Sequence, residues 1–328
     1  MATAITLARG VESPRRRQVA TGGKAIPRDA EQLDLEVDGG SVHLTKLRKV
    51  FWPQLGLTKQ DLLQYYLDVS RWLLPHLQNR AMVMKRYPNG IAGEFFFMKR
   101  TPTPRPPFIR VCSIEHASGN VIDFPVIKDV ATLLWVVNLG YIDLNPWYAR
   151  CDDVYKPDYL HFDLDPVEGT GFGKVLETAL LVRDALLSLK VKSYAKTTGS
   201  RGIHVYVPIK RGPQQKQVWA FAKAFSRELA ARHPKVVTAE HRVAKRPAGR
   251  VLVDYNQNAW TRTLASVYSV RPKPQASVST PVTWEEVERG VAIADFTMKN
   301  VPKRLARIGD LWKPLLGQRG RIDLARLL

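Results

Sequence analysis

The sequence predicts a mixed α/β (α+β) domain, because strand-like and helix-like segments alternate through most of its 328 residues. Apolar residues recur at helical spacing in Phe172–Leu189 and Gln214–Arg232. Short runs rich in β-branched and aromatic residues, typical of strands, form Tyr159–Pro166, Ile203–Pro208 and Arg250–Tyr255. We therefore expect a central mixed or antiparallel sheet flanked by helices.

The charge of the chain is its most unusual bulk property. It carries 50 Lys and Arg against 30 Asp and Glu, a formal net charge of +20, whereas its 45% hydrophobic and 24% charged content is ordinary. Such an excess favours a polyanionic partner through phosphate contacts and counterion release. Nucleic acid is the first candidate, although ribosomal, chromatin and membrane-surface proteins share this composition.

Several protein classes are disfavoured. The two cysteines, Cys112 and Cys151, cannot build a disulfide framework, nor a four-ligand zinc site without several histidines, so a reducing, cytoplasmic setting fits. No apolar run reaches the ~18 residues of a membrane span. The Arg15–Arg17 cluster precedes no apolar core with a cleavage site, so we expect no signal peptide and no membrane partner.

The N-terminal part contains a tail and then regular elements. Residues 1–40 contain no aromatic residue and no period, so we expect a disordered or loosely attached basic tail. Val42–Leu44 reads as a short strand, and Thr58 is a good N-cap for an amphipathic helix that reaches Leu74. Residues 41–316 would form one catalytic domain with an N-terminal α/β subregion, and 317–328 a C-terminal tail.

The next stretch combines aromatic and basic residues. Ala81–Tyr87 is strand-like and ends at a turn, and Phe95–Arg100 places three consecutive rings beside two bases. We expect at least one ring to be exposed for base stacking and two to lie in the core. Val121–Pro125 reads as a strand and Val130–Gly140 as a buried helix.

The remaining segments complete the alternation. Lys192–Lys196 is predicted as a strand, Arg271–Pro281 as a Pro/Ser linker and Thr283–Val291 as a short helix. Pro302–Leu316 is predicted as a closing helix. Its inward residues would be Leu305, Ile308, Leu311 and Trp312.

An Asp-x-Asp pair lies at the end of the Tyr159–Pro166 strand. Side chains alternate along a strand, so Asp163 and Asp165 project to one face, roughly 6–7 Å apart at their Cα atoms. Two carboxylates this close repel each other unless a cation lies between them, and Mg²⁺ or Mn²⁺ suits such oxygens. The alternative for an isolated pair is two solvated aspartates.

Two further segments strengthen the first interpretation. Thr197–Gly202 is a glycine- and hydroxyl-rich turn with Arg201, followed by His204, which suits a phosphate group. Asp254 is a third acid at a strand end. Three acids beside a phosphate-binding turn suit two-metal phosphoryl transfer. A hairpin turn with a histidine bonded to a carbonyl, and an ordinary strand-end aspartate, are the alternatives.

From about Leu44 to Leu316 the chain resembles the polymerase domain of bacterial ATP-dependent DNA ligase D, a member of the archaeo-eukaryotic primase superfamily. The resemblance rests on motifs that occur in the same order along the chain. They are Leu44–Lys46 with Lys49–Pro53, Phe96, Phe97 and Lys99, Asn138–Gly140 with Pro146 and Trp147, His161–Pro166, Gly199–His204, Val253–Asn258, and Ser269–Arg271.

The resemblance implies a primase-like fold and a nucleotidyltransferase that extends or fills in DNA ends in non-homologous end joining. It implies NTPs or dNTPs as substrates with a preference for ribonucleotides, two Mn²⁺ (or Mg²⁺) ions, and double-stranded DNA ends and gaps with a 5′-phosphate. Ku and an ATP-dependent DNA ligase are the implied partners, and the protein would be a monomer in the nucleoid. No Lys-x-Asp-Gly motif occurs, so we expect the ligase to act in trans.

The resemblance also assigns roles to residues. Asp163, Asp165 and Asp254 would be the catalytic metal ligands. The nucleotide-binding residues would be Thr198, Ser200, Arg201, His204, Arg271 and Asn145. Lys49 and Lys59 would bind the 5′-phosphate, with Lys85 on the adjacent basic surface, and Phe96 and Phe97 would stack on the template. Without the resemblance, Lys49 and Lys59 read as solvated charges flanking a helix.

Three positions depart from the family pattern. Asn145 stands where a histidine usually precedes Pro-Trp, and Thr198 and Arg201 replace serine and lysine in the turn. Arginine keeps the charge but changes the geometry. Because asparagine neither carries charge nor transfers a proton, the alternative function is a catalytically weak scaffold that binds 5′-phosphorylated DNA ends. A metal-dependent nuclease could use the same acids but does not explain the phosphate-binding turn or Arg271.

Overall fold

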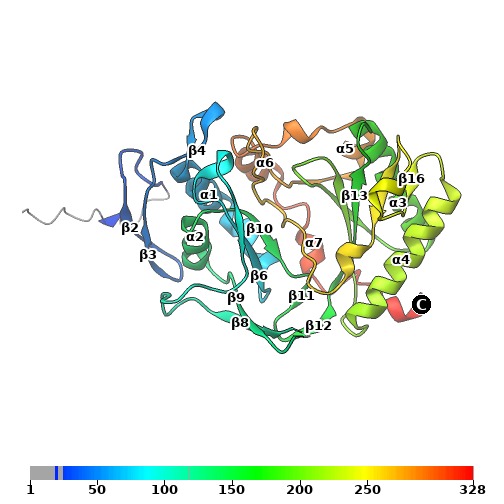
Figure 1. Ribbon diagram of the computed structural model, residues 1–328, viewed down its shortest axis with the longest axis horizontal. Coiled ribbons are helices and arrows are strands. Elements are labelled where there is room, and N and C mark those ends of the chain that lie inside the picture. Colours follow the sequence, from blue (N-terminus) through cyan, green and yellow to red (C-terminus); the bar gives the residue numbers. More distant parts are fainter. Residues whose placement is uncertain (1–18, 21–24, 117, 328) are drawn as a thin grey trace, which may run out of the picture.

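The computed structural model describes residues 19–20, 25–116 and 118–327. The chain forms two adjoining parts: an N-terminal part with α1 and α2, and a C-terminal part built on the sheet that contains β13, with α3 and α4 against it (Figure 1). One large hydrophobic core contains buried residues of both parts, and a second, smaller cluster includes Cys112, Phe124 and Trp147.

The N-terminal part begins earlier than the sequence predicted. β2 (Leu33–Val37) and β3 (Gly40–Leu44) form an antiparallel hairpin, and Leu33 and Leu35 are buried. The expected tail over residues 1–40 is therefore wrong from β2 onward, because its alternating apolar residues pair with β3. Residues 1–18 and 21–24 of that tail lie outside the described residues.

Helix α1 (Lys59–Leu77) starts where the sequence predicted. The Thr58 side chain accepts a hydrogen bond from the Asp61 backbone N–H, and the Asp61 side chain accepts one from the Thr58 backbone, which completes a capping box. α2 (Val130–Asn138) packs on α1 and is capped by Asp129. The strands of this part are β1 (Val19–Ala20), β4 (Val50–Trp52), β5 (Leu57–Thr58), β6 (Met82–Arg86), β7 (Phe96–Met98), β8 (Val111–Glu115), β9 (Val121–Pro125) and β10 (Tyr141–Pro146).

The main sheet carries the predicted strand-end acids. Its strand order is β16-β17-β13-β15-β14-β18, antiparallel except for the β16–β17 pair. The bounds are β13 (Tyr159–Pro166), β14 (Tyr194–Thr197), β15 (Ile203–Pro208), β16 (Val237–Thr238), β17 (Val251–Asp254) and β18 (Pro281–Val282). A short hairpin, β11 (Ala149–Arg150) and β12 (Asp153–Pro157), precedes β13.

The two faces of β13 differ. α3 (Phe172–Ser188) and α4 (Gln215–Arg232) cover one face, where the Phe162 ring lies 4.7 Å from that of Phe225. Because side chains alternate, His161 and the two aspartates Asp163 and Asp165 project from the other face, and the His161 ring stacks on Tyr206. The acids therefore face away from α3 and α4.

Three predictions for the C-terminal segments need correction. The expected linker Arg271–Pro281 is packed: Val278 and Ser279 are fully buried, because hydroxyl groups of this segment hydrogen-bond to neighbouring backbone. The expected closing helix is split into α6 (Val301–Ile308) and α7 (Lys313–Leu316) at Gly309, whose φ is 73°. Ile308, predicted to point inward, is 41% exposed.

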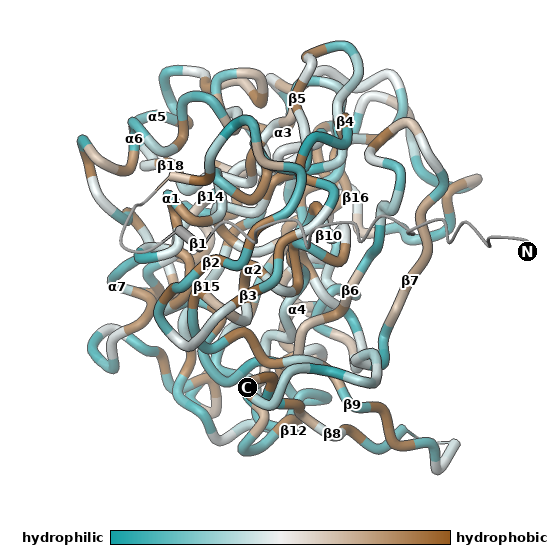
Figure 2. Tube along the Cα trace, turned by 90° about the vertical axis from the view of Figure 1, so that its left-hand side faces the viewer, coloured by the Kyte–Doolittle hydropathy of each residue, from teal (hydrophilic) through white to brown (hydrophobic). Residues whose placement is uncertain are grey.

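The predicted C-terminal tail also needs correction. Ile322 forms a parallel bridge with Ile209, and Leu324 is fully buried, so this segment packs on the core. Helix α5 (Trp284–Arg289) lies where a short helix was expected. Hydrophilic stretches occupy much of the outline of the chain in Figure 2, and none of the helices in the described ranges is long and apolar enough to cross a membrane.

Candidate active site

The sheet register places the predicted site residues in one row. The Cα of Asp163 pairs with that of Asp254 on β17 and with that of His204 on β15. Residues directly opposite on antiparallel strands lie about 4.5–5.5 Å apart. Asp254, Asp163 and His204 therefore lie side by side across three strands. Asp165 follows on the same face of β13.

A cavity of about 230 Å³ lies over this row. Its lining includes eight residues that the sequence singled out: Asn145, Asp163, Asp165, Thr198, Ser200, Arg201, His204 and Arg271. They come from four separate segments of the chain. Asp254 borders Asp163 through the sheet but does not line this cavity.

The turn between β14 and β15 is held by its own side chains. The Thr198 hydroxyl accepts hydrogen bonds from the backbone N–H groups of Ser200 and Gly202, both at 3.1 Å. These two N–H groups are thus already satisfied, so a ligand would meet the side chains of the turn. The replacement of serine by Thr198 retains the hydroxyl that this arrangement needs.

The turn also requires its glycines. Gly199 has a φ of 65°, and a Cβ there would lie 2.7 Å from Arg271 Cγ. A Cβ on Gly202 would lie 2.1 Å from the carbonyl oxygen of Leu164. Arg271 donates to the Thr198 carbonyl at 2.6 Å, while its buried Nε has no hydrogen-bond partner among the described atoms. Arg271 therefore lines the cavity and is held by the turn through the Thr198 carbonyl.

The acids are electrostatically destabilised as anions. Burial raises the pKa of Asp163 to about 6, although Lys196, His161, Arg271 and Arg201 act in the opposite direction. Burial and the Asp163 charge raise the pKa of Asp165 despite the Arg201 guanidinium, which lies 3.1 Å from it. A cation between these two carboxylates would relieve both effects.

Asp254 has a different environment. Its carboxylate accepts hydrogen bonds from His241 Nε2 at 2.8 Å, the Asn256 backbone N–H at 2.7 Å and Gln257 Nε2 at 3.0 Å. Within the described part of the chain, no three His, Cys, Asp or Glu side chains are placed together to hold a metal ion. The hard oxygen donors fit a divalent ion chemically, but the pair in the cavity is Asp163 and Asp165.

Lys196 is a site residue that sequence analysis did not identify. It is fully buried on β14 directly opposite His204 on β15, and its Nζ lies 2.8 Å from His204 Nδ1, 2.8 Å from the Ala265 carbonyl and 2.5 Å from Ser279 Oγ. Ser279 Oγ donates to the Thr197 carbonyl and therefore accepts from Lys196. Burial and Arg271 lower the pKa of Lys196 well below its usual value, whereas the Asp163 charge acts in the opposite direction. The three acceptors match the three hydrogens of an ammonium group and therefore favour the cationic form.

This contact determines the state of His204. Burial and the nearby Lys196 and Arg271 hold the pKa of His204 well below its usual value, so the imidazole is neutral. Because Nδ1 accepts from Lys196, the proton resides on Nε2, which lies 3.3 Å from Asp163 Oδ1. The only sequence signal for Lys196 is its position directly before the Thr197–Gly202 turn.

The predicted DNA-end residues lie apart from the cavity on the N-terminal part. Lys49 Nζ donates to Asn89 Oδ1 at 2.7 Å, and Lys59 Nζ donates to the Thr45 carbonyl at 2.6 Å. Lys59 is only 4% exposed, and burial together with Lys46, Arg86 and Lys49 lowers its pKa to about 8.

The aromatic run is more exposed than predicted. Phe95, Phe96 and Phe97 are 49%, 45% and 63% exposed, so the expectation of two core rings is wrong, because β7 pairs only with β6 and its rings find no covering layer. Lys85 Nζ lies 3.7 Å from the centre of the Phe95 ring. Lys85 and Phe97 line a second cavity of about 470 Å³ that shares Asn145 with the first.

Comparison with known proteins identifies the family. The family model for the LigD primase-polymerase domain matches residues 58–312. The multifunctional non-homologous end joining protein LigD of Mycolicibacterium smegmatis is 33% identical over 276 residues, which cover 84% of this chain and 36% of that protein. The bifunctional LigD of Bacillus subtilis is 30% identical over 82% of this chain and 43% of that protein. The chain thus spans less than half the length of these relatives.

A solved structure agrees with the sequence matches. The polymerase domain from Mycobacterium tuberculosis ligase D, in complex with DNA, superposes with a TM-score of 0.79 at 29% identity, covering 84% of this chain and 98% of that one. The fold is therefore the archaeo-eukaryotic primase-like fold that the sequence predicted. The chain belongs to the LigD primase-polymerase domain family.

Proposed function

We propose that this protein is a primer-extending and gap-filling nucleotidyltransferase that acts on DNA ends in non-homologous end joining. The observation that carries the proposal is the Asp254–Asp163–His204 row beside a cavity lined by Ser200, Arg201 and Arg271. Carboxylates and phosphate-binding cations meet there, as transfer of a nucleotide from a triphosphate requires.

The side chains that line the nucleotide cavity would have different roles. Ser200, Arg201 and Arg271 would bind and orient the triphosphate so that a primer 3′-hydroxyl attacks its α-phosphorus and pyrophosphate leaves. His204 would donate from Nε2 to a phosphate oxygen, and Thr198 keeps the turn in shape. Asn145 borders both cavities and would contact the nucleotide without transferring a proton.

Asp163 and Asp165, with Asp254 beside them, would hold divalent ions. Mn²⁺ or Mg²⁺ bound there would stabilise the charge that develops on the phosphate oxygens. The raised pKa values of Asp163 and Asp165 support this assignment, since a bound cation lowers the cost of ionising both. Arg201, 60% exposed, is free to leave Asp165 for a phosphate.

The DNA end would bind to the N-terminal part. Lys49 and Lys59 would bind the 5′-phosphate, Lys85 would contact the adjacent backbone, and Phe96 and Phe97 would stack on the template. We further propose a preference for ribonucleotides, a monomeric state, action in the nucleoid, and cooperation with Ku and an ATP-dependent DNA ligase. The names of the relatives support a role in end joining, and the DNA-bound structure of the mycobacterial domain supports DNA binding.

The test is extension of a gapped DNA with a downstream 5′-phosphate and Mn²⁺, comparing NTPs with dNTPs. We expect extension by the wild type with NTPs preferred, none by Asp163→Ala, and a loss in Lys49→Ala restricted to 5′-phosphorylated gaps. Equal extension of phosphorylated and unphosphorylated gaps by the wild type would contradict the end-recognition assignment.

A catalytically weak scaffold that binds 5′-phosphorylated ends is the second candidate. Two observations favour it: Asn145 replaces the usual histidine, and Arg201 pairs with Asp165. Tight binding to the phosphorylated gap without extension of any primer would support the scaffold and exclude the polymerase.

A further inference from the structure

A basic cavity of about 570 Å³ lies at the opposite end of the main sheet from the acids. The residues that matter here are Arg150, Asp158, Lys210, Arg211, Gln318 and Arg321. Asp158 lies directly before β13 and precedes Asp163 by five residues, a span of roughly 16 Å in an extended chain, and Lys210 follows β15. None of these residues lines the nucleotide cavity or belongs to the predicted DNA-end surface.

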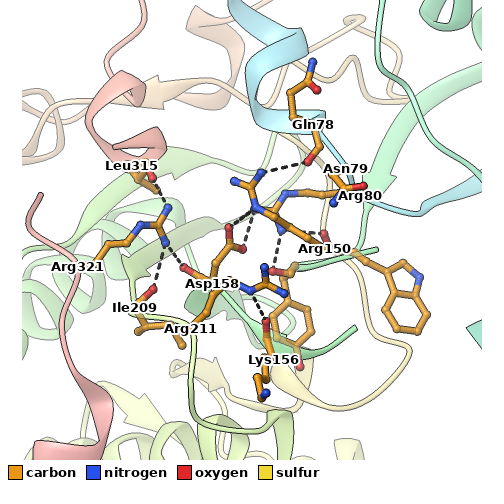
Figure 3. A network of polar contacts seen from close by, with 12 residues as sticks. Gln78, Asn79, Arg80, Arg150, Lys156, Asp158, Ile209, Arg211, Leu315 and Arg321 are labelled. Carbon is orange, nitrogen blue, oxygen red and sulfur yellow. Dashed lines mark hydrogen bonds and ion pairs between the residues drawn. The ribbon is translucent and has the colours of Figure 1, made fainter. Parts of the chain in front are cut away.

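Three guanidinium groups surround Asp158 in this region, and two of them pair with its carboxylate. Figure 3 shows Arg80, Arg150 and Arg321 converging on Asp158. Arg80 donates to both carboxylate oxygens at 2.7 and 2.8 Å, and Arg150 Nε donates to one of them at 2.9 Å. Arg321 instead donates to backbone carbonyls, among them those of Asp158 and Ile209. The network therefore carries an excess of two positive charges.

This excess positive charge is electrostatically unfavourable because the centre of the network is buried. The Arg80 and Asp158 side chains are each 2% exposed and the Arg150 side chain is 26% exposed, so water screens their charges weakly. Arg211 adds a further cation whose partner is Asp152 at the rim. An anion in the cavity would offset the uncompensated charge.

The cavity also offers donors for such an anion. The side chains of Lys210 and Gln318 line it, and neither has a hydrogen bond or ion pair to the described residues. Arg150 uses Nε for Asp158 and Nη1 for the Gln78 carbonyl, which leaves Nη2 for a ligand. An ammonium, an amide and a guanidinium edge together suit a tetrahedral oxyanion.

We propose that this cavity is a second phosphate-binding site, separate from the nucleotide site and independent of the function proposed above. The ligand is a phosphate group, supplied either by the backbone of bound DNA or by free inorganic phosphate. Lys210 and Arg150 supply the charge, and Gln318 donates a neutral hydrogen bond.

The first experiment measures the thermal unfolding midpoint in inorganic phosphate and in chloride at equal ionic strength. Lys210→Gln removes one cavity cation, and Lys192→Gln is the matched control, because Lys192 is exposed and does not line the cavity. We expect phosphate to raise the midpoint of the wild type and of Lys192→Gln by several degrees more than that of Lys210→Gln. Equal phosphate responses of the two variants would overturn the proposal.

A second variant tests the charge argument without added ligand. Gln318→Glu places a carboxylate of nearly the same shape in the cavity, where it would imitate the bound anion. We expect a higher midpoint than the wild type in phosphate-free, low-salt buffer and a lost response to phosphate. A lower midpoint in that buffer would contradict an excess of positive charge.

The third arm identifies the source of the phosphate. Affinity for a long duplex is measured across chloride concentrations for wild type, Lys210→Gln and Lys192→Gln. A slope of log K against log salt that falls by about 0.9 only in Lys210→Gln assigns the site to the DNA backbone. Unchanged DNA binding together with a lost phosphate response assigns it to the free anion.

Discussion

At the scale of single residues, the contact between Lys196 and His204 gives the site a defined protonation state. The Lys196 ammonium fills the Nδ1 side of the ring and leaves the proton on Nε2. Without Lys196, both neutral tautomers of His204 become accessible, and one of them presents the Nε2 lone pair to a phosphate oxygen. Lys196 is thus a positioning residue that acts through His204.

Lys196→Met should lower kcat/KM for nucleotide incorporation by about 10- to 100-fold, corresponding to roughly 1–3 kcal/mol for one misdirected buried hydrogen bond. The measurement is a double-mutant cycle with His204→Gln, followed by steady-state extension and by thermal unfolding as a folding control. If Lys196 acts through His204, its substitution has little further effect in the His204→Gln background. Fully additive losses would contradict this role.

Lys59 provides a pH-dependent prediction at the same scale. Its pKa, lowered by burial to about 8, leaves it cationic at pH 7 and neutral at pH 9. A bound 5′-phosphate favours the cationic form, so the advantage of phosphorylated over unphosphorylated ends should decrease as the pH rises above 8. The measurement is the ratio of dissociation constants for the two ends between pH 7 and pH 9.5.

Lys59→Gln serves as the control, because glutamine does not titrate in this range. Its ratio should be small and constant with pH. A wild-type ratio that stays constant up to pH 9.5 would show that Lys59 does not contact the phosphate.

At the scale of elements, the turn between β14 and β15 determines the shape of the nucleotide cavity. Gly199→Ala places a Cβ 2.7 Å from Arg271 Cγ and 2.9 Å from the Ser279 backbone N at a positive φ, so the turn must move. We expect KM for the nucleotide to rise more than about tenfold, with a thermal midpoint lowered by several degrees. Steady-state extension at varied NTP concentration measures the first effect.

Gly212→Ala is the matched control. A Cβ at Gly212 meets no atom within 4 Å, so this substitution should change neither KM nor stability. A Gly199→Ala variant with an unchanged KM would show that the turn does not contact the nucleotide.

Strand β7 makes a second prediction for an element. Because the Phe97 ring is 63% exposed, Phe97→Ala should leave stability unchanged and weaken binding to a single-stranded template overhang. The loss expected for one stacked base is about 1–3 kcal/mol. Fluorescence anisotropy with overhang and blunt-ended DNA measures it. Leu189→Ala, at a residue 42% exposed at the end of α3, is the control.

The elements also show what the sequence could predict. Local signals placed α1, because Thr58 is a good N-cap before an amphipathic segment, and placed β13 and its acids, because a run of strand-forming residues ends at a proline. Arg271–Pro281 was misread because small and hydroxyl-bearing residues resemble a linker. Only the tertiary structure supplies the backbone partners of Ser277 and Ser279.

The site was predicted by motif rather than by geometry. Asp163, Asp165 and the turn were accessible from local patterns, but their distance from Arg271 depends on strand order, which the sequence alone leaves open. Lys196 was not identified as a site residue because no local sequence pattern indicates that its strand is buried on both faces.

At the scale of the whole molecule, the Arg80–Asp158 pair joins the two parts of the chain. Arg80 lies between α1 and β6, whereas Asp158 leads into β13, and Arg321 ties the C-terminal segment to the same point. Residues 317–328 were predicted to be a tail because this contact arises only in the tertiary structure. Leu324 of this segment is part of the hydrophobic core.

Removing the shared carboxylate should therefore destabilise the entire fold. Asp158→Asn keeps the shape but leaves the buried Arg80 guanidinium without a counter-charge, at an expected cost of about 3–5 kcal/mol. The measurement is the free energy of unfolding from a denaturant titration. Asp153→Asn, which alters an exposed ion pair with Lys156, should change it by less than about 1 kcal/mol.

The pH dependence of this difference tests its electrostatic origin. Burial alone would raise the pKa of Asp158, but Arg80 and Arg150 outweigh it and hold the pKa below its usual value of 3.8. The unfolded state therefore takes up protons first, so the contribution is fully present above about pH 5 and is lost as the pH falls through the folded-state pKa. The gap between wild type and Asp158→Asn should accordingly narrow from pH 5 towards pH 2. A gap that stays constant over that range would assign the loss to packing, not to charge.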